Sequence, residues 1–161
     1  MNTVVFPGSF DPVTNGHLDL ITRASFLAER VIVAVAINTS KHPLFDLKER
    51  CSLLSLATEH LNGVEIIPFN GLLADFAKEH QAQALLRGIR GATDADYEIQ
   101  LAQVNRSLNT QLETILLPAH ASTGFISSTV VKEVFKHGGD IRQLVPTCVQ
   151  KAFIKQQVNK L

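Results

Sequence analysis

The chain has 161 residues, of which 45% are hydrophobic and 19% charged, so it is too apolar for a disordered protein and long enough for one domain with a buried core. Its 15 Lys and Arg residues balance 15 Asp and Glu residues, which argues against the positive field of a protein that grips nucleic acid through phosphates. The N-terminus lacks a signal-peptide pattern and no apolar run reaches about 18 residues, so we expect one cytoplasmic domain over 1–161 that binds no membrane.

Short runs rich in Val, Ile and Leu predict β-strands at 4–6, 31–36, 64–68, 84–87 and 114–117. These runs hardly alternate with polar residues, so each strand is expected to be covered on both faces. Segments of helical period lie between and after them, at 17–29, 46–60, 71–80, 94–108, from 127 or 128 to 136, and after Pro146. The alternation resembles an α/β fold of the Rossmann-like, doubly wound type, with a five-stranded parallel sheet and helices on both faces.

Ligands of open parallel sheets bind beyond the carboxyl ends of the strands, so the loops that follow the strands should hold the site. The first of these loops runs from Gly8 to His17. Gly8 permits close backbone approach, Ser9 offers a hydroxyl, and Gly16 and His17 would present N–H groups and an imidazole at the start of a helix, an arrangement suited to phosphate. The alternative is that Asp11-Pro12 and Asn15-Gly16 only form turns. The segment matches neither G-x-G-x-x-G nor a P-loop, which disfavours a dehydrogenase or a P-loop kinase.

Three further groups of residues could bind phosphate at the same edge of the sheet. Ser127, Ser128 and Thr129 open a helix, where they either hold an anion or simply cap the helix. Arg87 and Arg90 offer two guanidinium forks after the fourth strand, or else form ion pairs with acidic residues such as Asp94 or Asp96. Lys41 adds a cation after the second strand, or is a surface lysine.

Two of these segments resemble the T/H-x-G-H and I-S-S-T signatures of the nucleotidyltransferase superfamily, with Thr14 in place of the first histidine and Lys132 near the position of a superfamily arginine. The blocks S-K-H-P-L-F at 40–45, L-L-R-G-I-R at 85–90 and F-I-S-S-T-V-V-K-E-V at 125–134 are more specific. Together with the acidic stretch at 94–98, they resemble the phosphopantetheine adenylyltransferase family over nearly the whole chain.

The resemblance implies transfer of AMP from ATP to 4′-phosphopantetheine, with Mg²⁺ on the triphosphate, to give dephospho-coenzyme A and pyrophosphate. His17 would then be catalytic, and Asp11 is interpreted as a turn former. The implied contacts with 4′-phosphopantetheine are Ser9, Lys41, Leu73 and Arg87. The implied contacts with ATP are Ser9, Phe10, His17, Gly88, Ile89, Arg90, Glu98, Thr123, Gly124, Phe125, Ile126, Ser127, Ser128 and Thr129.

The resemblance also implies a homohexamer and feedback binding of coenzyme A. Gln100, Leu101, Val104 and Leu108 would form either an interface stripe or part of the core. Competing interpretations are a nucleotidyltransferase with another acceptor, such as nicotinamide mononucleotide, a cytidylyltransferase, a non-catalytic nucleotide sensor, or a synthetase-like module that binds RNA. All the enzymatic interpretations require the segments ending in His17 and Thr129 to meet in space.

Overall fold

A parallel sheet carries all five strands that the apolar runs predict, in a computed structural model that describes residues 1–37 and 42–158. The strands are β1 (Thr3–Gly8), β2 (Arg30–Ala36), β3 (Val64–Phe69), β4 (Ala84–Ile89) and β5 (Glu113–Pro118). They lie in the order β3-β2-β1-β4-β5, and every neighbouring pair is parallel. Each predicted strand is confirmed and extends one or two residues further at one end or both.

Six helices are described, and each matches a predicted segment. They are α1 (Asn15–Leu27), α2 (Leu47–Thr58), α3 (Leu73–Glu79), α4 (Ala92–Leu108), α5 (Ser128–Lys136) and α6 (Thr147–Val158). The predicted capping box of α2 is present, because the Asp46 carboxylate accepts the Glu49 N–H and the Glu49 side chain accepts the Asp46 N–H. α1 begins two residues before the predicted start because Thr14 caps it.

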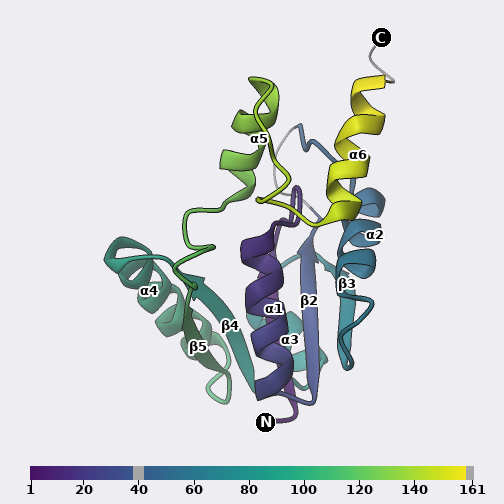
Figure 1. Ribbon diagram of the computed structural model, residues 1–161. Helices are drawn as coiled ribbons and strands as arrows, with labels where there is room; N and C mark the ends of the chain where they lie inside the picture. The colour runs from purple at the N-terminus through teal and green to yellow at the C-terminus, as the bar shows by residue number, and fades with distance from the viewer. Residues whose placement is uncertain (38–41, 159–161) are drawn as a thin grey trace.

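Helices cover both faces of the sheet, which confirms the doubly wound fold (Figure 1). Residues of α1, α2, α5 and α6 pack with alternate residues of the central strands, such as Val4 and Phe6. α3 packs on the opposite face, where Phe76 joins Val5 and Ile32, and α4 lies against β4, β5 and α3.

The prediction that every strand is covered on both faces holds only in part for the two edge strands. Glu65 of β3 and Glu113 of β5 are exposed, as are Pro68 and Pro118 near the ends of the same strands. An edge strand has a neighbour on one side only, so its ends lie beyond the reach of the covering helices.

A crevice opens where the chain reverses its direction across the sheet. From β1 the chain proceeds to β2 and β3 on one side, whereas β4 and β5 lie on the other. The register between β1 and β4 is limited to Val4 opposite Ala84 and Val5 opposite Leu85, although both strands continue further. The two strands therefore separate at their carboxyl ends, the usual position of a ligand site in this fold.

No helix within 1–37 or 42–158 combines the length and apolarity needed to cross a membrane.

Candidate active site

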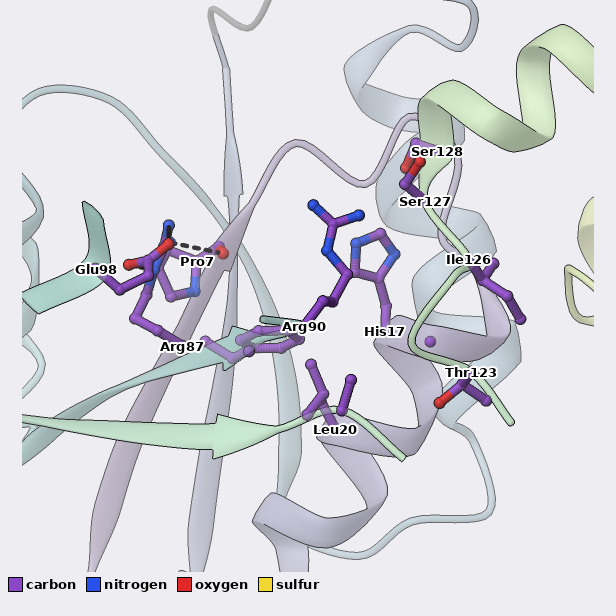
Figure 2. A pocket seen from close by; sticks show the side chains of 14 residues that line it. Pro7, His17, Leu20, Arg87, Arg90, Glu98, Thr123, Ile126, Ser127 and Ser128 are labelled. Atoms are coloured by element: carbon purple, nitrogen blue, oxygen red, sulfur yellow. Dashed lines mark hydrogen bonds and ion pairs between the residues drawn. The ribbon is translucent and has the colours of Figure 1, made fainter. Parts of the chain in front are cut away.

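A cavity of about 240 Å³ lies at the separated carboxyl ends of β1 and β4. It draws residues from β1, the start of α1, β4, α4 and the loop before α5. Its lining consists of Phe6, Pro7, Gly16, His17, Leu20, Arg87, Gly88, Arg90, Glu98, Ala119, Thr123, Ile126, Ser127 and Ser128. Figure 2 shows Arg87 and Glu98 on one side of the opening, Ser127 and Ser128 on the other, and His17 and Arg90 between them.

The segments ending at His17 and Thr129 do meet, as the enzymatic interpretations require. The Ser128 hydroxyl donates a hydrogen bond of 2.8 Å to the carbonyl oxygen of Pro12. A Cβ atom on Gly16 would lie 3.3 Å from the carbonyl oxygens of Thr123 and Ile126. The absence of a side chain at Gly16 therefore lets the start of α1 approach the loop before α5.

His17 presents a neutral imidazole with a defined tautomer. Its Nδ1 lies 3.1 Å from the Thr14 backbone nitrogen and 3.1 Å from the Thr14 hydroxyl oxygen. A backbone N–H can only donate, so Nδ1 is an acceptor and the proton of the neutral ring is on Nε2. Burial, and secondly the positive charge of Arg90, lower the pKa of His17 to about 4. His17 is therefore uncharged at pH 7 and offers Nε2–H as a hydrogen-bond donor.

Arg87 forms a bidentate ion pair with Glu98 across the cavity wall. Arg87 Nε lies 2.7 Å from Glu98 Oε2 and Nη2 lies 2.8 Å from Oε1, while Nη1 donates to the Pro7 carbonyl at 3.5 Å. Pro7 belongs to the part of β1 beyond its paired register with β4. Arg87 thus bridges the gap between the two strands and brings a guanidinium to the cavity.

Arg90 is held less tightly. Its Nε lies 3.0 Å from Asp94 Oδ2, and the same oxygen accepts the Arg90 backbone N–H at 3.1 Å. The arginine side chain is 50% exposed, so it can reorient toward a bound anion at little cost. Both arginines therefore have carboxylate partners, although Arg87 pairs with Glu98 rather than with Asp94 or Asp96.

Two helices, α1 and α5, begin at the cavity. Ser127 caps α5 by accepting the Val130 N–H, which confirms the interpretation of this segment as a helix cap. Ser127 and Ser128 also line the cavity. The N–H groups of Ser128 and Thr129 have no acceptor within the helix. In the first turn of α1, Asn15 N–H donates to the Leu144 carbonyl and His17 N–H to the Thr14 hydroxyl. Two backbone donors of α1 are thus already bonded, whereas α5 offers unpaired ones, and both helix starts add the positive end of a helix dipole, an arrangement suited to phosphate.

Several predicted contact residues lie outside the lining of this cavity. Leu73 lines a neighbouring hollow of about 160 Å³ that also includes Arg87 and Glu98. Lys41 lies outside the described residues. The remaining described positions that are not part of the lining are Ser9, Phe10, Ile89, Gly124, Phe125 and Thr129.

Phe10 is 1% exposed, and its ring packs edge-on against His17 with centroids 5.0 Å apart. The Phe10 side chain therefore supports His17 from behind.

Sequence reasoning missed the apolar part of the lining, namely Phe6, Pro7, Leu20 and Ala119. A proline inside an otherwise apolar strand is a signal that could have located the point where β1 and β4 part. The interpretation of Asp11 was incomplete as well. Asp11 does lie in a turn, but its buried carboxylate accepts the N–H groups of Leu44 and Phe45 and lies 3.5 Å from Lys132 Nζ.

Within the described ranges, no cluster of three or more His, Cys, Asp or Glu side chains could hold a metal ion. Asp11 and Glu98, two acidic residues close to the site, both form hydrogen bonds to other groups of the chain. The cavity therefore presents positive and neutral donors, a set suited to the oxygens of phosphate groups.

The two cysteines, Cys51 and Cys148, are free and lie outside the cavity lining. Burial raises the pKa of both thiols, which makes them poor nucleophiles.

Comparison with known proteins places the chain in a family. The Cytidylyltransferase-like family model matches residues 5–134. Phosphopantetheine adenylyltransferase of Psychromonas ingrahamii is 75% identical over 154 residues, 96% of each chain. The enzyme of the same name from Haemophilus ducreyi is 50% identical over 158 residues, 98% of each chain.

The sheet and its helices also match a solved structure. A Vibrio parahaemolyticus protein assigned as a nicotinate-nucleotide adenylyltransferase superposes with a TM-score of 0.73 over 96% of this chain and 99% of the other. At 17% identity this likeness supports the fold alone. The sequence relatives are far closer, and by them the chain belongs to the phosphopantetheine adenylyltransferase family, within the cytidylyltransferase-like proteins.

Proposed function

We propose that the cavity between β1 and β4 joins ATP to 4′-phosphopantetheine, giving dephospho-coenzyme A and pyrophosphate in coenzyme A biosynthesis. Family membership supports the reaction. The observation that carries it is the convergence of His17, Arg90 and the start of α5 on one cavity whose wall is the Arg87–Glu98 pair. His17, Arg90 and the start of α5 can thus bind the triphosphate of ATP, while Arg87 in the wall binds the phosphate of the acceptor.

In this reaction the terminal phosphate of the acceptor attacks the α-phosphorus of ATP. A phosphate is already a nucleophile at neutral pH, so the reaction needs no general base, and catalysis rests on alignment and on stabilisation of the growing charge. His17 donates from Nε2–H to a non-bridging oxygen of the α-phosphate. Since the Thr14 backbone fixes the tautomer, this donor needs no rearrangement as the transition state forms.

The acceptor lies on the Arg87 side of the cavity. Glu98 occupies the Nε–Nη2 edge of the Arg87 guanidinium and fixes its plane, and the Nη1–Nη2 edge binds the phosphate in bidentate fashion. The hollow lined by Leu73, Leu101 and Ala102 continues from Arg87 and suits the less polar pantetheine arm. Ser9 and Lys41 complete the acceptor contacts in this proposal.

The triphosphate extends toward Arg90 and the start of α5, where Ser128 and Thr129 bind the leaving pyrophosphate. The other proposed contacts with ATP are Ser9, Phe10, Gly88, Ile89, Glu98 and the segment 123–127. Mg²⁺ enters with ATP as part of the substrate and is held by phosphate oxygens and water, and it offsets the charge of the triphosphate. This fits a site whose donors are cations and N–H groups.

Pyrophosphate release from ATP tests the proposal, with 4′-phosphopantetheine, nicotinamide mononucleotide or nicotinate mononucleotide as acceptor and with CTP in place of ATP in a parallel set. We expect rapid release only with ATP and 4′-phosphopantetheine. Release with a mononucleotide, or with CTP, would assign a different member of the superfamily. ATP binding without release for any acceptor would indicate a nucleotide sensor.

The family also supports a cytoplasmic homohexamer with feedback binding of coenzyme A, which we include in the proposal. Of the four predicted stripe residues, Gln100, Val104 and Leu108 are exposed and Leu101 is half-buried, and Tyr97 lies one helical turn before Leu101 on α4. Tyr97, Val104 and Leu108 are 60%, 54% and 54% exposed, so the interpretation of Val104 and Leu108 as core residues is wrong for the single chain. An exposed apolar stripe of this kind is suited to contact with another copy.

A further inference from the structure

Side chains from three separate elements hold the backbone of Leu44 and Phe45, just before α2. The Asp11 carboxylate accepts the N–H groups of Leu44 and Phe45 at 2.9 and 2.8 Å. Gln156 of α6 donates to the Leu44 carbonyl at 3.0 Å, and Arg50 of α2 donates to the Phe45 carbonyl at 3.2 Å. All four backbone polar groups of this dipeptide are thereby bonded to side chains.

Arg50 extends this network to the first loop of the proposed active site. Its Nη1 lies 2.8 Å from the Ser9 carbonyl oxygen and 2.9 Å from the Ala36 carbonyl oxygen at the end of β2. The residue is only 2% exposed. Burial of a guanidinium costs free energy that hydrogen bonds must offset, and here the three acceptors are backbone carbonyls of three ligand-side segments.

The first loop contains a conformation that needs such support. Phe10 has a φ of 50°, in the left-handed region that a bulky L-residue seldom adopts. A conformation of this kind persists only where its surroundings hold it. The Phe10 ring is fixed among Phe6 and His17, and Arg50 fixes the preceding carbonyl, that of Ser9.

We propose that Arg50 is a positioning residue for catalysis: by bonding the carbonyls of Ser9, Ala36 and Phe45, it sets the position of the Ser9 loop relative to His17. The inference rests on the proposed function, in which Ser9 contacts both substrates. Arg50 acts through Ser9 and does not line the cavity. Its loss should therefore reduce the rate of adenylyl transfer more than it reduces ATP binding, because small misalignments of reacting groups lower kcat by up to about 10²-fold.

A double-mutant cycle between Arg50→Met and Ser9→Ala tests the inference, with kcat, both KM values and the ATP dissociation constant measured for each variant. Arg50→Met keeps the length and apolar stem of the side chain and removes its donors. Thr58→Val is the matched control. Thr58 is also buried, lies two helical turns after Arg50 at the end of α2, and donates a hydrogen bond to the backbone carbonyl of Leu54. Arg50→Lys, which keeps the charge and one donor group, should recover part of the lost rate.

We expect Arg50→Met to lower kcat about 10-fold or more, with a change in the ATP dissociation constant of less than about threefold. The losses in kcat caused by Arg50→Met and Ser9→Ala should be strongly non-additive, because Ser9 is already misplaced when Arg50 is absent. The fold losses in kcat caused by Thr58→Val and Ser9→Ala should instead multiply in the double variant. If Arg50→Met does not fold, as judged by circular dichroism, Arg50→Lys enters the same cycle. Additive effects of the Arg50 variant and Ser9→Ala would overturn the inference and leave the proposed function intact. A folded wild type that binds ATP but releases no pyrophosphate with 4′-phosphopantetheine would overturn both.

Discussion

His17 is the residue on which the proposed chemistry most depends. Its surroundings keep the imidazole neutral, with Nε2–H as its hydrogen-bond donor. Thr14 occupies the place that a histidine holds in many relatives of the superfamily, and here it both caps α1 and accepts the His17 N–H. The Thr14 backbone N–H fixes the His17 tautomer, a function that any residue except proline can serve. The absence of a first histidine therefore leaves the donor at His17 intact.

Replacement of His17 by alanine should lower kcat by several orders of magnitude while the protein remains folded and binds ATP. Loss of one preorganised donor to the transition state typically costs about 10²–10³ in kcat. Steady-state kinetics, a melting curve and ATP titration measure the three quantities. Thr14→Val, which keeps the backbone N–H, should have a much smaller effect, and near-normal turnover of His17→Ala would refute the assignment.

The lowered pKa of His17 predicts a pH dependence of stability. The ordinary pKa is 6.5 and the folded value is about 4, so the unfolded chain binds more protons between these limits, and the free energy of unfolding falls as the pH decreases from 7. Because the ring is partly open to the cavity, its contribution is at most about 2 kcal/mol between pH 7 and pH 5.

Denaturant titrations at pH 7 and pH 5 should show a smaller pH dependence for His17→Gln than for the wild type. Equal dependence in both proteins would mean that the folded pKa of His17 is ordinary.

Arg87 and Arg90 should differ in what their removal affects. Arg87→Ala leaves Glu98, 8% exposed, without its cation, so we expect a loss of stability of about 1–3 kcal/mol and a higher KM for 4′-phosphopantetheine. Arg90→Ala removes an exposed contact worth less than about 1 kcal/mol and should mainly raise the KM for ATP.

Kinetics with each substrate varied in turn, together with thermal melts, separate the two arginines. An unchanged KM for 4′-phosphopantetheine in Arg87→Ala would count against its contact with the acceptor phosphate.

At the scale of elements, β4 and α1 approach each other because Gly88 has no side chain. A Cβ at this position would collide with a terminal methyl of Leu20. The colliding atom is the end of a side chain that can turn aside, so Gly88→Ala should destabilise the protein by only about 0.5–1.5 kcal/mol, and it should lower activity because both residues line the cavity. Gly91→Ala is the matched control, because a Cβ there meets nothing within 4 Å.

Thermal melts of both glycine variants, of Leu20→Ala and of the double variant Gly88→Ala/Leu20→Ala test this packing. Leu20→Ala alone should lower stability because Leu20 is a buried core residue, but Gly88→Ala should cost less stability in the Leu20→Ala background than in the wild type, since the collision is then absent. Equal melting temperatures for Gly88→Ala and Gly91→Ala would show that the contact is unimportant.

The elements and motifs could be predicted because local patterns encode them. Continuous apolar runs located the strands, and Asp46 with Glu49 marked the start of α2. The pairing of Arg87 with Glu98 and the hold of Arg50 on Ser9 could not be predicted, because these contacts join residues 11 and 41 positions apart whose meeting depends on the packed fold. The edge strands were misjudged for the same reason, since an apolar run does not reveal its place in the sheet.

At the scale of the whole molecule, the apolar stripe on α4 connects the single chain with the proposed assembly. Val104→Lys places a charge within the stripe and should shift the particle to a smaller mass in size-exclusion chromatography with light scattering. Gln103→Lys adds the same charge at an exposed neighbouring position and should leave the mass unchanged. If Val104→Lys keeps the wild-type mass, this face of α4 is not the interface.

The strand order has a consequence for co-translational folding. β1 is made first but occupies the middle of the sheet, and one of its two neighbours, β4, begins at residue 84. The nascent chain can assemble β1, β2 and β3 early, with one edge of β1 open until β4 has been made. Ser127 and Ser128 emerge later still, so the cavity between β1 and β4 can be completed only after the chain has been made well beyond β4.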